Sequence, residues 1–81
     1  MTYKKVYIDV ITHFDKNGTI LPLRILWEDG TEYDIDRIID IRPAASLKAG
    51  GCGIRYTCMI KGHKKYIFLE NQRWFAEGKA I

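Results

Sequence analysis

The alternation of apolar and polar residues with a period of two is the feature that most constrains this chain. From residue 6 onward, one set of alternate positions holds Val6, Ile8, Val10, Thr12 and Phe14. Successive side chains of a β-strand point to opposite faces, and β-branched residues favour strands, so this pattern predicts a strand over residues 6–15. Asn17-Gly18 follows. This dipeptide tolerates the positive φ angles of a tight turn, and it predicts a β-hairpin.

The same pattern recurs along the rest of the chain between further turn signals. These signals are Glu28-Asp29-Gly30, Gly62-His63 and Asn71-Gln72. The second predicted strand ends at residue 28, and four further strands are predicted over residues 31–42, 54–61, 64–70 and 73–76. Residues 77–81 are expected to fray. Six short strands joined mostly by tight turns predict an all-β fold, a six-stranded antiparallel meander closed into a small SH3-like or OB-like barrel. At 81 residues, the chain is predicted to form one domain over residues 1–81.

Three positions are predicted to interrupt this regular pattern. Pro22 cannot donate a hydrogen bond to a ladder, so it belongs at an edge or a strand start. Arg37 falls on the apolar face of its strand, which indicates a bulge or bend near Asp36-Arg37. A helix through Ile35, Ile38 and Ile39 is the competing interpretation. Pro43 is expected to end the strand and to begin an eleven-residue loop over residues 43–53.

The alternation also predicts which side chains share a face in the last strands. Tyr56 and Cys58 fall on one face with Ile60, opposite Arg55, and Tyr66 and Phe68 are assigned to the apolar face opposite Lys65. Several strands carry apolar residues on both faces, more than a small barrel interior holds. This surplus predicts packing under the long loop or in a homodimer interface.

Chain length and cysteine content bound the classes of function. A domain this small has few side chains left to line a deep cavity, which argues against an enzyme, a cofactor site and a small-molecule substrate. The chain has two cysteines, too few for a secreted disulfide framework, and no apolar run long enough to span a membrane. The N-terminal residues do not resemble a signal peptide, so a cytoplasmic protein is predicted.

Charge is divided sharply along the chain. Residues 28–40 hold six acids and one base, a net charge of −5, whereas residues 42–65 hold six bases and no acid, a net charge of +6. The two runs either form neighbouring strands that attract each other or create two faces of opposite charge.

The chain resembles a group of short bacterial proteins of unknown function. The resemblance lies in Trp27-Glu28-Asp29-Gly30, Ile35-Asp36-Arg37-Ile38, the stretch RPAASLKAGGCGIRYTC over residues 42–58, and Arg73-Trp74-Phe75. It implies a small all-β, barrel-like domain of bacterial cytoplasmic origin, and it carries no activity, cofactor or catalytic residue.

Cysteine and histidine residues offer two weak chemical hypotheses. Cys52, Cys58 and His63 are spaced Cys-x5-Cys-x4-His, with His13 as a possible fourth ligand, but zinc knuckles place paired cysteines two to four residues apart. No metal site is therefore predicted. Cys52 lies between glycines in a basic stretch, where its thiol could act as a nucleophile if a histidine lay within reach. The glycines around it lack the lysine and the helix of a P-loop.

A basic and aromatic surface is the remaining candidate site. Arg55, Lys61, Lys64 and Lys65 cluster in the predicted fourth and fifth strands, and small barrels bind nucleic acids through stacked aromatics and phosphate contacts. The main prediction is a non-enzymatic binding module that self-associates as a homodimer. Nucleic-acid binding by residues 42–65 is the first alternative, and an enzyme with a Cys52 nucleophile is the second.

Overall fold

The computed structural model describes the backbone of residues 2–80 and the side chains of residues 3–78. Within these residues the chain forms eight β-strands and no helix, so no helix is long and apolar enough to cross a membrane. The strands are β1 (Thr2–Tyr7), β2 (Asp9–Phe14), β3 (Ile20–Leu26), β4 (Glu32–Asp34), β5 (Arg37–Ala45), β6 (Cys52–Ile60), β7 (His63–Glu70) and β8 (Arg73–Ala80).

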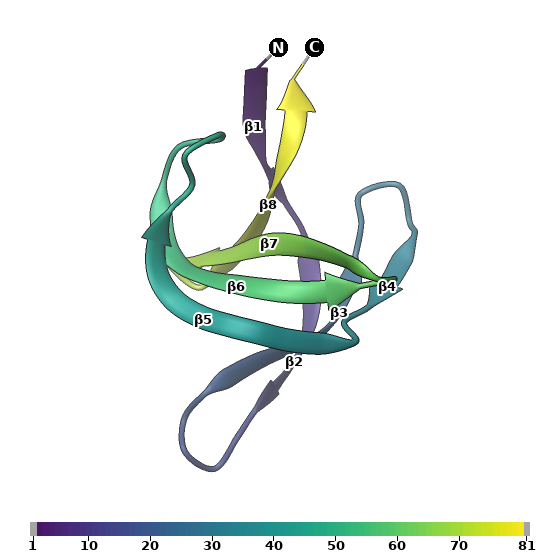
Figure 1. The fold of residues 1–81 in the computed structure, drawn as a ribbon, viewed down its shortest axis with the longest axis vertical. Helices are drawn as coiled ribbons and strands as arrows, with labels where there is room; N and C mark the ends of the chain where they lie inside the picture. The colour runs from purple at the N-terminus through teal and green to yellow at the C-terminus, as the bar shows by residue number, and fades with distance from the viewer. Residues whose placement is uncertain (1, 81) are drawn as a thin grey trace.

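The strands form two antiparallel sheets, shown in Figure 1. One sheet has five strands in the order β1-β8-β7-β6-β5, and the other has three in the order β2-β3-β4. The all-β class and the antiparallel meanders are confirmed. The prediction of six strands is wrong, and the strands pair as two separate sheets where a single closed barrel was expected.

Two of the predicted strands divide because the chain changes sheet within them. The first divides at Ile8, whose backbone N–H donates to the carbonyl of Trp74. The second divides at residues 35 and 36. The N–H of Ile35 donates to the carbonyl of Leu23 in β3, while that of Asp36 donates to the carbonyl of Met59 in β6. Adjacent amides thus bond to different sheets, which confirms the bend near Asp36-Arg37 and excludes the helix.

The structure corrects the predicted ends of two strands. β5 continues through Pro43, which lies opposite Ile54, and the loop before β6 shortens to residues 46–51. Proline is tolerated there because β5 is an edge strand of its sheet. β8 runs to Ala80, paired with β1, where fraying was expected from residue 77. Ile81 lies outside the described residues.

The four predicted turns are confirmed. Gly18 and Gly62 have φ angles of 87° and 77°, in the left-handed region that glycine adopts without a Cβ clash. Asn71 and Gln72 join β7 to β8 with φ angles of 51° and 66°. Positive φ at both central residues is the geometry of a type I′ hairpin turn.

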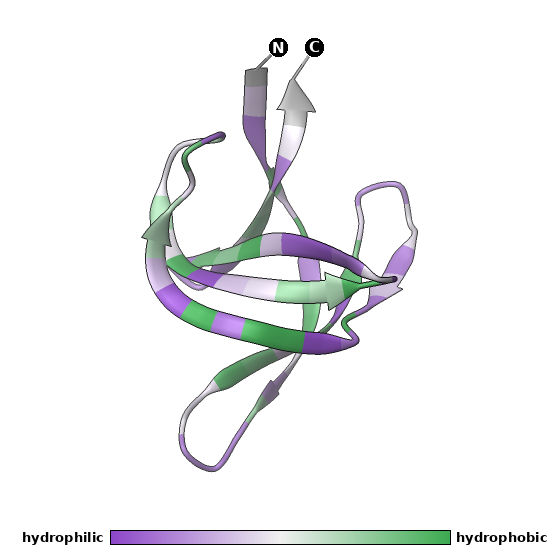
Figure 2. Ribbon diagram, in the orientation of Figure 1, coloured by the Kyte–Doolittle hydropathy of each residue, from purple (hydrophilic) through white to green (hydrophobic). Residues whose placement is uncertain are grey.

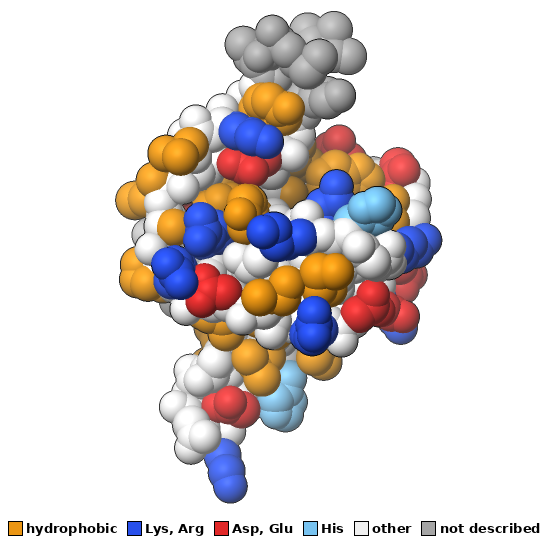
Figure 3. Space-filling model, in the orientation of Figure 1, with side chains coloured by type: hydrophobic (Ala, Val, Ile, Leu, Met, Phe, Trp, Pro, Cys, Tyr) orange, Lys and Arg blue, Asp and Glu red, His pale blue; other side chains and the backbone are white. Residues whose placement is uncertain are grey.

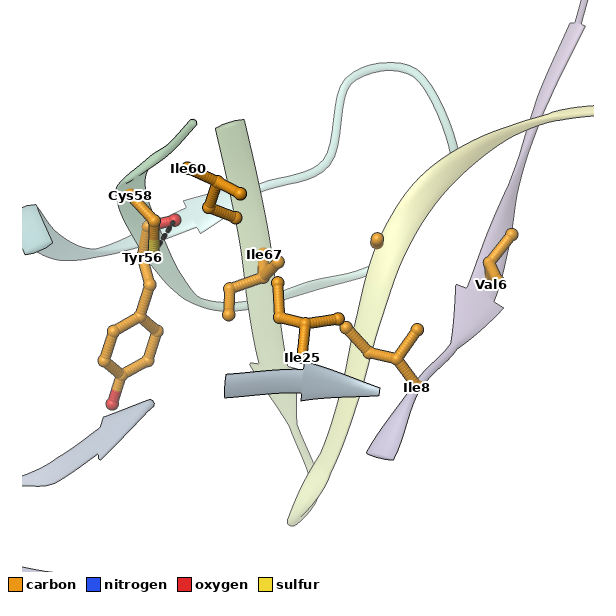
Figure 4. Close-up of a cluster of buried hydrophobic side chains, with 8 residues drawn as sticks. Val6, Ile8, Ile25, Tyr56, Cys58, Ile60 and Ile67 are labelled. Atoms are coloured by element: carbon orange, nitrogen blue, oxygen red, sulfur yellow. Dashed lines mark hydrogen bonds between the residues drawn. The ribbon is translucent and has the colours of Figure 1, made fainter. Parts of the chain in front are cut away.

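The main core lies between the two sheets (Figure 4), and Figure 2 shows the alternation of hydropathy along β5. The Tyr56 hydroxyl donates a 2.7 Å hydrogen bond to the carbonyl of Ile20, which ties β6 to β3. Cys58 is fully buried, as the alternation predicted. The buried cluster consists of Val6, Ile8, Ile25, Tyr56, Cys58, Ile60, Ile67 and Ala76.

A second cluster covers the outer face, by which we mean the face of the five-stranded sheet that points away from β2-β3-β4. Phe68 and Phe75 lie opposite each other on β7 and β8, with stacked rings 4.9 Å apart and exposures of 1% and 0%. Tyr7 packs edge-on against Phe75 at 6.2 Å. The register places Ile67 in the main core and Phe68 on the outer face, so the predicted facing of Phe68 is wrong although it is buried.

An ion pair between Lys5 and Glu70 lies against this second cluster. The Lys5 ammonium lies 5.0 Å from the centre of the Phe75 ring and 2.6 Å from Glu70. The Cys52 N–H also donates to Glu70, at 2.7 Å, which fixes the end of the loop before β6. The hydrogen bonds from Lys5 and Cys52 lower the pKa of Glu70 below its ordinary value.

Candidate functional site

A groove opens where β7 and β8 separate. The two strands are paired only between residues 67–70 and 73–76. The first half of β7 stays paired with β6, and the last part of β8 stays paired with β1, so the strands diverge, as Figure 1 shows. The opening forms a groove of about 800 Å³, with β3 and β4 contributing to its wall.

The groove combines apolar, aromatic and cationic side chains. Three isoleucines and Ala76 from the main core form its apolar part, and Glu77 lies in it as a single acid. The Ser46 hydroxyl donates a 2.7 Å hydrogen bond to that acid. The remaining lining side chains are aromatic or basic: Tyr3, Trp27, Tyr33, Tyr66, Lys48, Lys64 and Lys65.

Aromatic rings hold basic groups around this groove. The Lys48 ammonium lies 4.9 Å from the centre of the Tyr3 ring, and the Lys61 ammonium lies 5.4 Å from that of Tyr33. The Arg55 guanidinium lies 4.7 Å from the centre of the Tyr66 ring. A cation within about 6 Å of a ring centre is attracted to the electron-rich face. Each ring therefore keeps positive charge close to an aromatic surface.

The basic surface continues onto the outer face of β5, β6 and β7. Arg42 lies opposite Arg55, and Lys64 lies opposite Met59, so their side chains share this face with Tyr66. Figure 3 shows Lys and Arg side chains spread over these strands. A long anionic ligand in the groove would meet further positive charge there.

The four basic residues that the sequence predicted as a nucleic-acid site lie on different parts of the structure. Arg55 and Lys64 lie on the outer face, Lys65 projects on the opposite face beside Cys58, and Lys61 occupies the turn after β6. Lys64 and Lys65 both line the groove because it runs along the open edge of β7.

Tyr66 is the aromatic residue whose position the alternation predicted incorrectly. It pairs opposite Thr57 on the side of Arg55, and it is 39% exposed. Alternation within β7 shows which residues share a face, but only pairing with β6 decides which face is buried.

The acidic and basic runs of the chain neutralise each other only in part. Arg42 of the basic run pairs with Asp40 of the acidic run, whereas Glu32 and Asp34 pair with Arg24 of β3, which lies outside the basic run. Among the described side chains, none of these ion pairs involves Arg55 or the lysines at positions 48, 61, 64 and 65. Their charge is therefore available to a ligand.

The cysteines and histidines do not assemble into a site. Cys52 is exposed at the start of β6, whereas His63 lies opposite Ile60 at the far end of that strand. The two residues lie at opposite ends of β6, which measures about 26 Å along the strand, so His63 cannot act as a base for Cys52. His13 belongs to the other sheet. Within residues 2–80 no cluster of three metal-ligating side chains occurs.

Sequence reasoning missed the residues that reach the groove from elsewhere in the chain. Tyr3 comes from β1, Trp27 and Tyr33 flank the turn between β3 and β4, and Lys48 comes from the loop before β6. No spacing pattern links these segments, because the divergence of β7 from β8 brings them together.

No family model, curated protein or solved structure matches this chain. The resemblance to short bacterial all-β proteins therefore stays a prediction.

Proposed function

We propose that this protein is a non-enzymatic binding module that holds a single strand of nucleic acid in the groove between β7 and β8. One observation carries the proposal. The groove gathers four aromatic rings with Lys48, Lys64 and Lys65, and Glu77, the only acid among the described residues that line it, already accepts a hydrogen bond from Ser46. Stacking rings beside basic side chains form the chemical combination that binds single strands with little sequence preference.

Two features favour a single-stranded polymer over other anions. Aromatic side chains stack on bases only where the bases are free of a duplex stack, and Tyr66 is exposed for such contact. Positive charge also extends beyond the groove onto the outer face through Arg55, which takes part in no ion pair among the described side chains. Several successive phosphates could bind along this path, whereas a compact anion would use only part of it.

The cysteines favour a reducing, cytoplasmic location for this function. Cys52 and Cys58 are both free thiols, and they lie six positions apart on one extended strand. Such a separation, about 20 Å along a strand, prevents a disulfide within one chain.

Fluorescence anisotropy with a labelled oligonucleotide of mixed sequence tests the proposal. Binding should be measurable at low salt and should weaken as salt rises, because bound phosphates release counterions. Contacts by the three groove lysines predict a slope of log K against log salt of about −2, at roughly −0.7 per phosphate of a single strand. A labelled duplex should bind more weakly.

A matched pair of charge reversals locates the site. Lys65→Glu should weaken binding and reduce the salt slope, whereas Lys16→Glu should leave both nearly unchanged. Both lysines are exposed and both changes alter the net charge equally, but Lys16 lies in the turn between β2 and β3. Equal losses in the two variants would indicate general electrostatic attraction and would contradict a site in the groove.

A second pair tests stacking. Tyr66→Ala should weaken binding by roughly 5- to 150-fold, the equivalent of about 1 to 3 kcal/mol for one stacked base. Tyr66→Phe keeps the ring and should bind like the unaltered protein. No binding at low salt, or equal binding by the alanine and phenylalanine variants, would overturn the proposal.

A further inference from the structure

The free edge of β5 forms a surface that the groove does not use. β5 has nine residues and lies at the end of the five-stranded sheet, where only β6 pairs with it. The backbone N–H and C=O groups along its other edge therefore have no strand partner within residues 2–80. Such an edge is a template for another strand.

The side chains of this edge suit pairing with an identical strand. Ile39, the unpaired residue of a β-bulge, is 47% exposed, and Ile41 is 40% exposed. Asp40 and Arg42 flank Ile41, and both project on the outer face, where Arg42 Nε lies 2.6 Å from Asp40. The sequence around Ile41 is thus apolar at its centre and carries one charge of each sign, one on either side.

We propose that two copies of this chain pair through their β5 edges as antiparallel strands, with a two-fold axis at Ile41. In this register Ile41 lies opposite Ile41 of the second copy. Asp40 of each copy lies opposite Arg42 of the other, so the four charges alternate in sign. Opposite charges at directly opposed positions stabilise an antiparallel pair. A register displaced by two residues would lose both of these charge pairs.

Pro43 sets the extent of the pairing. It has no N–H to donate, so the added ladder is confined to the residues around Ile41. We therefore expect a reversible dimer that forms at high micromolar concentration. The apolar residues on both faces of several strands predicted a homodimer. The β5 pairing assigns the interface of that homodimer to one edge of the five-stranded sheet.

The dimer has a consequence for the basic surface. A two-fold axis that relates antiparallel edge strands is perpendicular to the sheet, so both outer faces point the same way. Arg55 and Lys64 of the two copies would then lie on one continuous ten-stranded sheet. A nucleic-acid strand could cross from one copy to the other.

Charge-swapped variants test the β5 pairing by sedimentation equilibrium in the absence of nucleic acid. The unaltered protein should show an average mass that rises towards that of a dimer with concentration. Asp40→Arg places like charges opposite each other in a homodimer, and so does Arg42→Asp, so each variant alone should remain monomeric. An equimolar mixture of the two variants should dimerise, because each copy then complements the other.

The mixture distinguishes a loss of pairing between two copies from a change in structure within one copy. Both single variants lose the Asp40–Arg42 ion pair of the monomer, and mixing cannot restore it. Both also keep a positive net charge, starting from +3, so overall charge does not attract them to each other. Circular dichroism should confirm that both variants are folded.

Three results would overturn the β5 pairing. These are an unaltered protein that stays monomeric at high micromolar concentration, a single variant that dimerises as well as the unaltered protein, and a mixture of folded variants that stays monomeric. None of these results depends on whether the groove binds nucleic acid, so the two proposals can fail independently.

Discussion

Replacing Phe75 by leucine tests whether the outer face of the five-stranded sheet holds a second core. The side chain is 0% exposed, stacks on Phe68 and meets Tyr7 edge-on. Two aromatic contacts contribute about 0.5 to 1.5 kcal/mol each beyond the burial of area, and leucine keeps most of the apolar volume. We expect the free energy of unfolding to fall by about 2 kcal/mol.

Urea denaturation measures this change against a matched control. With a slope of about 1.5 kcal/mol/M, the midpoint of Phe75→Leu should fall by about 1.3 M. Phe14→Leu makes the same substitution at a side chain that is 69% exposed, and it should change stability by less than about 0.5 kcal/mol. Equal midpoints for the two variants would refute the second core and the β7–β8 register that creates it.

Three further predictions concern single groups. A thiol reagent should label exposed Cys52 rapidly and Cys58 only on unfolding, because burial blocks access and raises the pKa of the Cys58 thiol to about 11; equal rates would contradict the facing of β6. Tyr56→Phe should lower the unfolding free energy by about 1 kcal/mol, since it removes the hydrogen bond that links the sheets; an unchanged urea midpoint would show that this bond contributes nothing. The pKa of Glu70 is lowered mainly by its hydrogen bond from Lys5. The pair therefore stabilises the fold fully at a pH above the ordinary carboxyl pKa, and this stabilisation is lost as the pH falls through the lower pKa of the folded state. Thermal melts between neutral and acid pH should therefore show a smaller loss of stability for Glu70→Gln than for the unaltered protein, and equal losses would contradict the role of the pair.

Local signals in the sequence predicted strands and turns, but not how the strands divide between sheets. The alternation continues across Ile8 without a break, yet the chain changes sheet there. At the second change of sheet, residues 35 and 36, the misplaced Arg37 predicted a bend but not a change of pairing partner. Likewise, alternation assigned Tyr66 to the buried face, whereas its pairing opposite Thr57 exposes it. Pairing partners are set by contacts between distant segments, which no local pattern contains.

For the candidate site, the sequence likewise predicted individual residues but not how the fold brings them together. The basic run over residues 42–65 identified Lys64 and Lys65, which line the groove. It also included Arg55 and Lys61, which lie beside the groove against aromatic rings. The groove itself could not be predicted, because it results from the separation of β7 and β8 after four paired positions.

The indole N–H signals of the two tryptophans provide the most direct test of binding in the groove. Trp27 lines the groove, whereas Trp74 packs against Tyr56 and does not. In a two-dimensional ¹H–¹⁵N spectrum recorded during titration with single-stranded DNA at low salt, the Trp27 indole signal should shift together with the amides of residues 63–66. The Trp74 indole signal should stay in place. A shift of the Trp74 signal alone, or no shift of either signal at saturating DNA, would contradict a nucleic-acid site between β7 and β8.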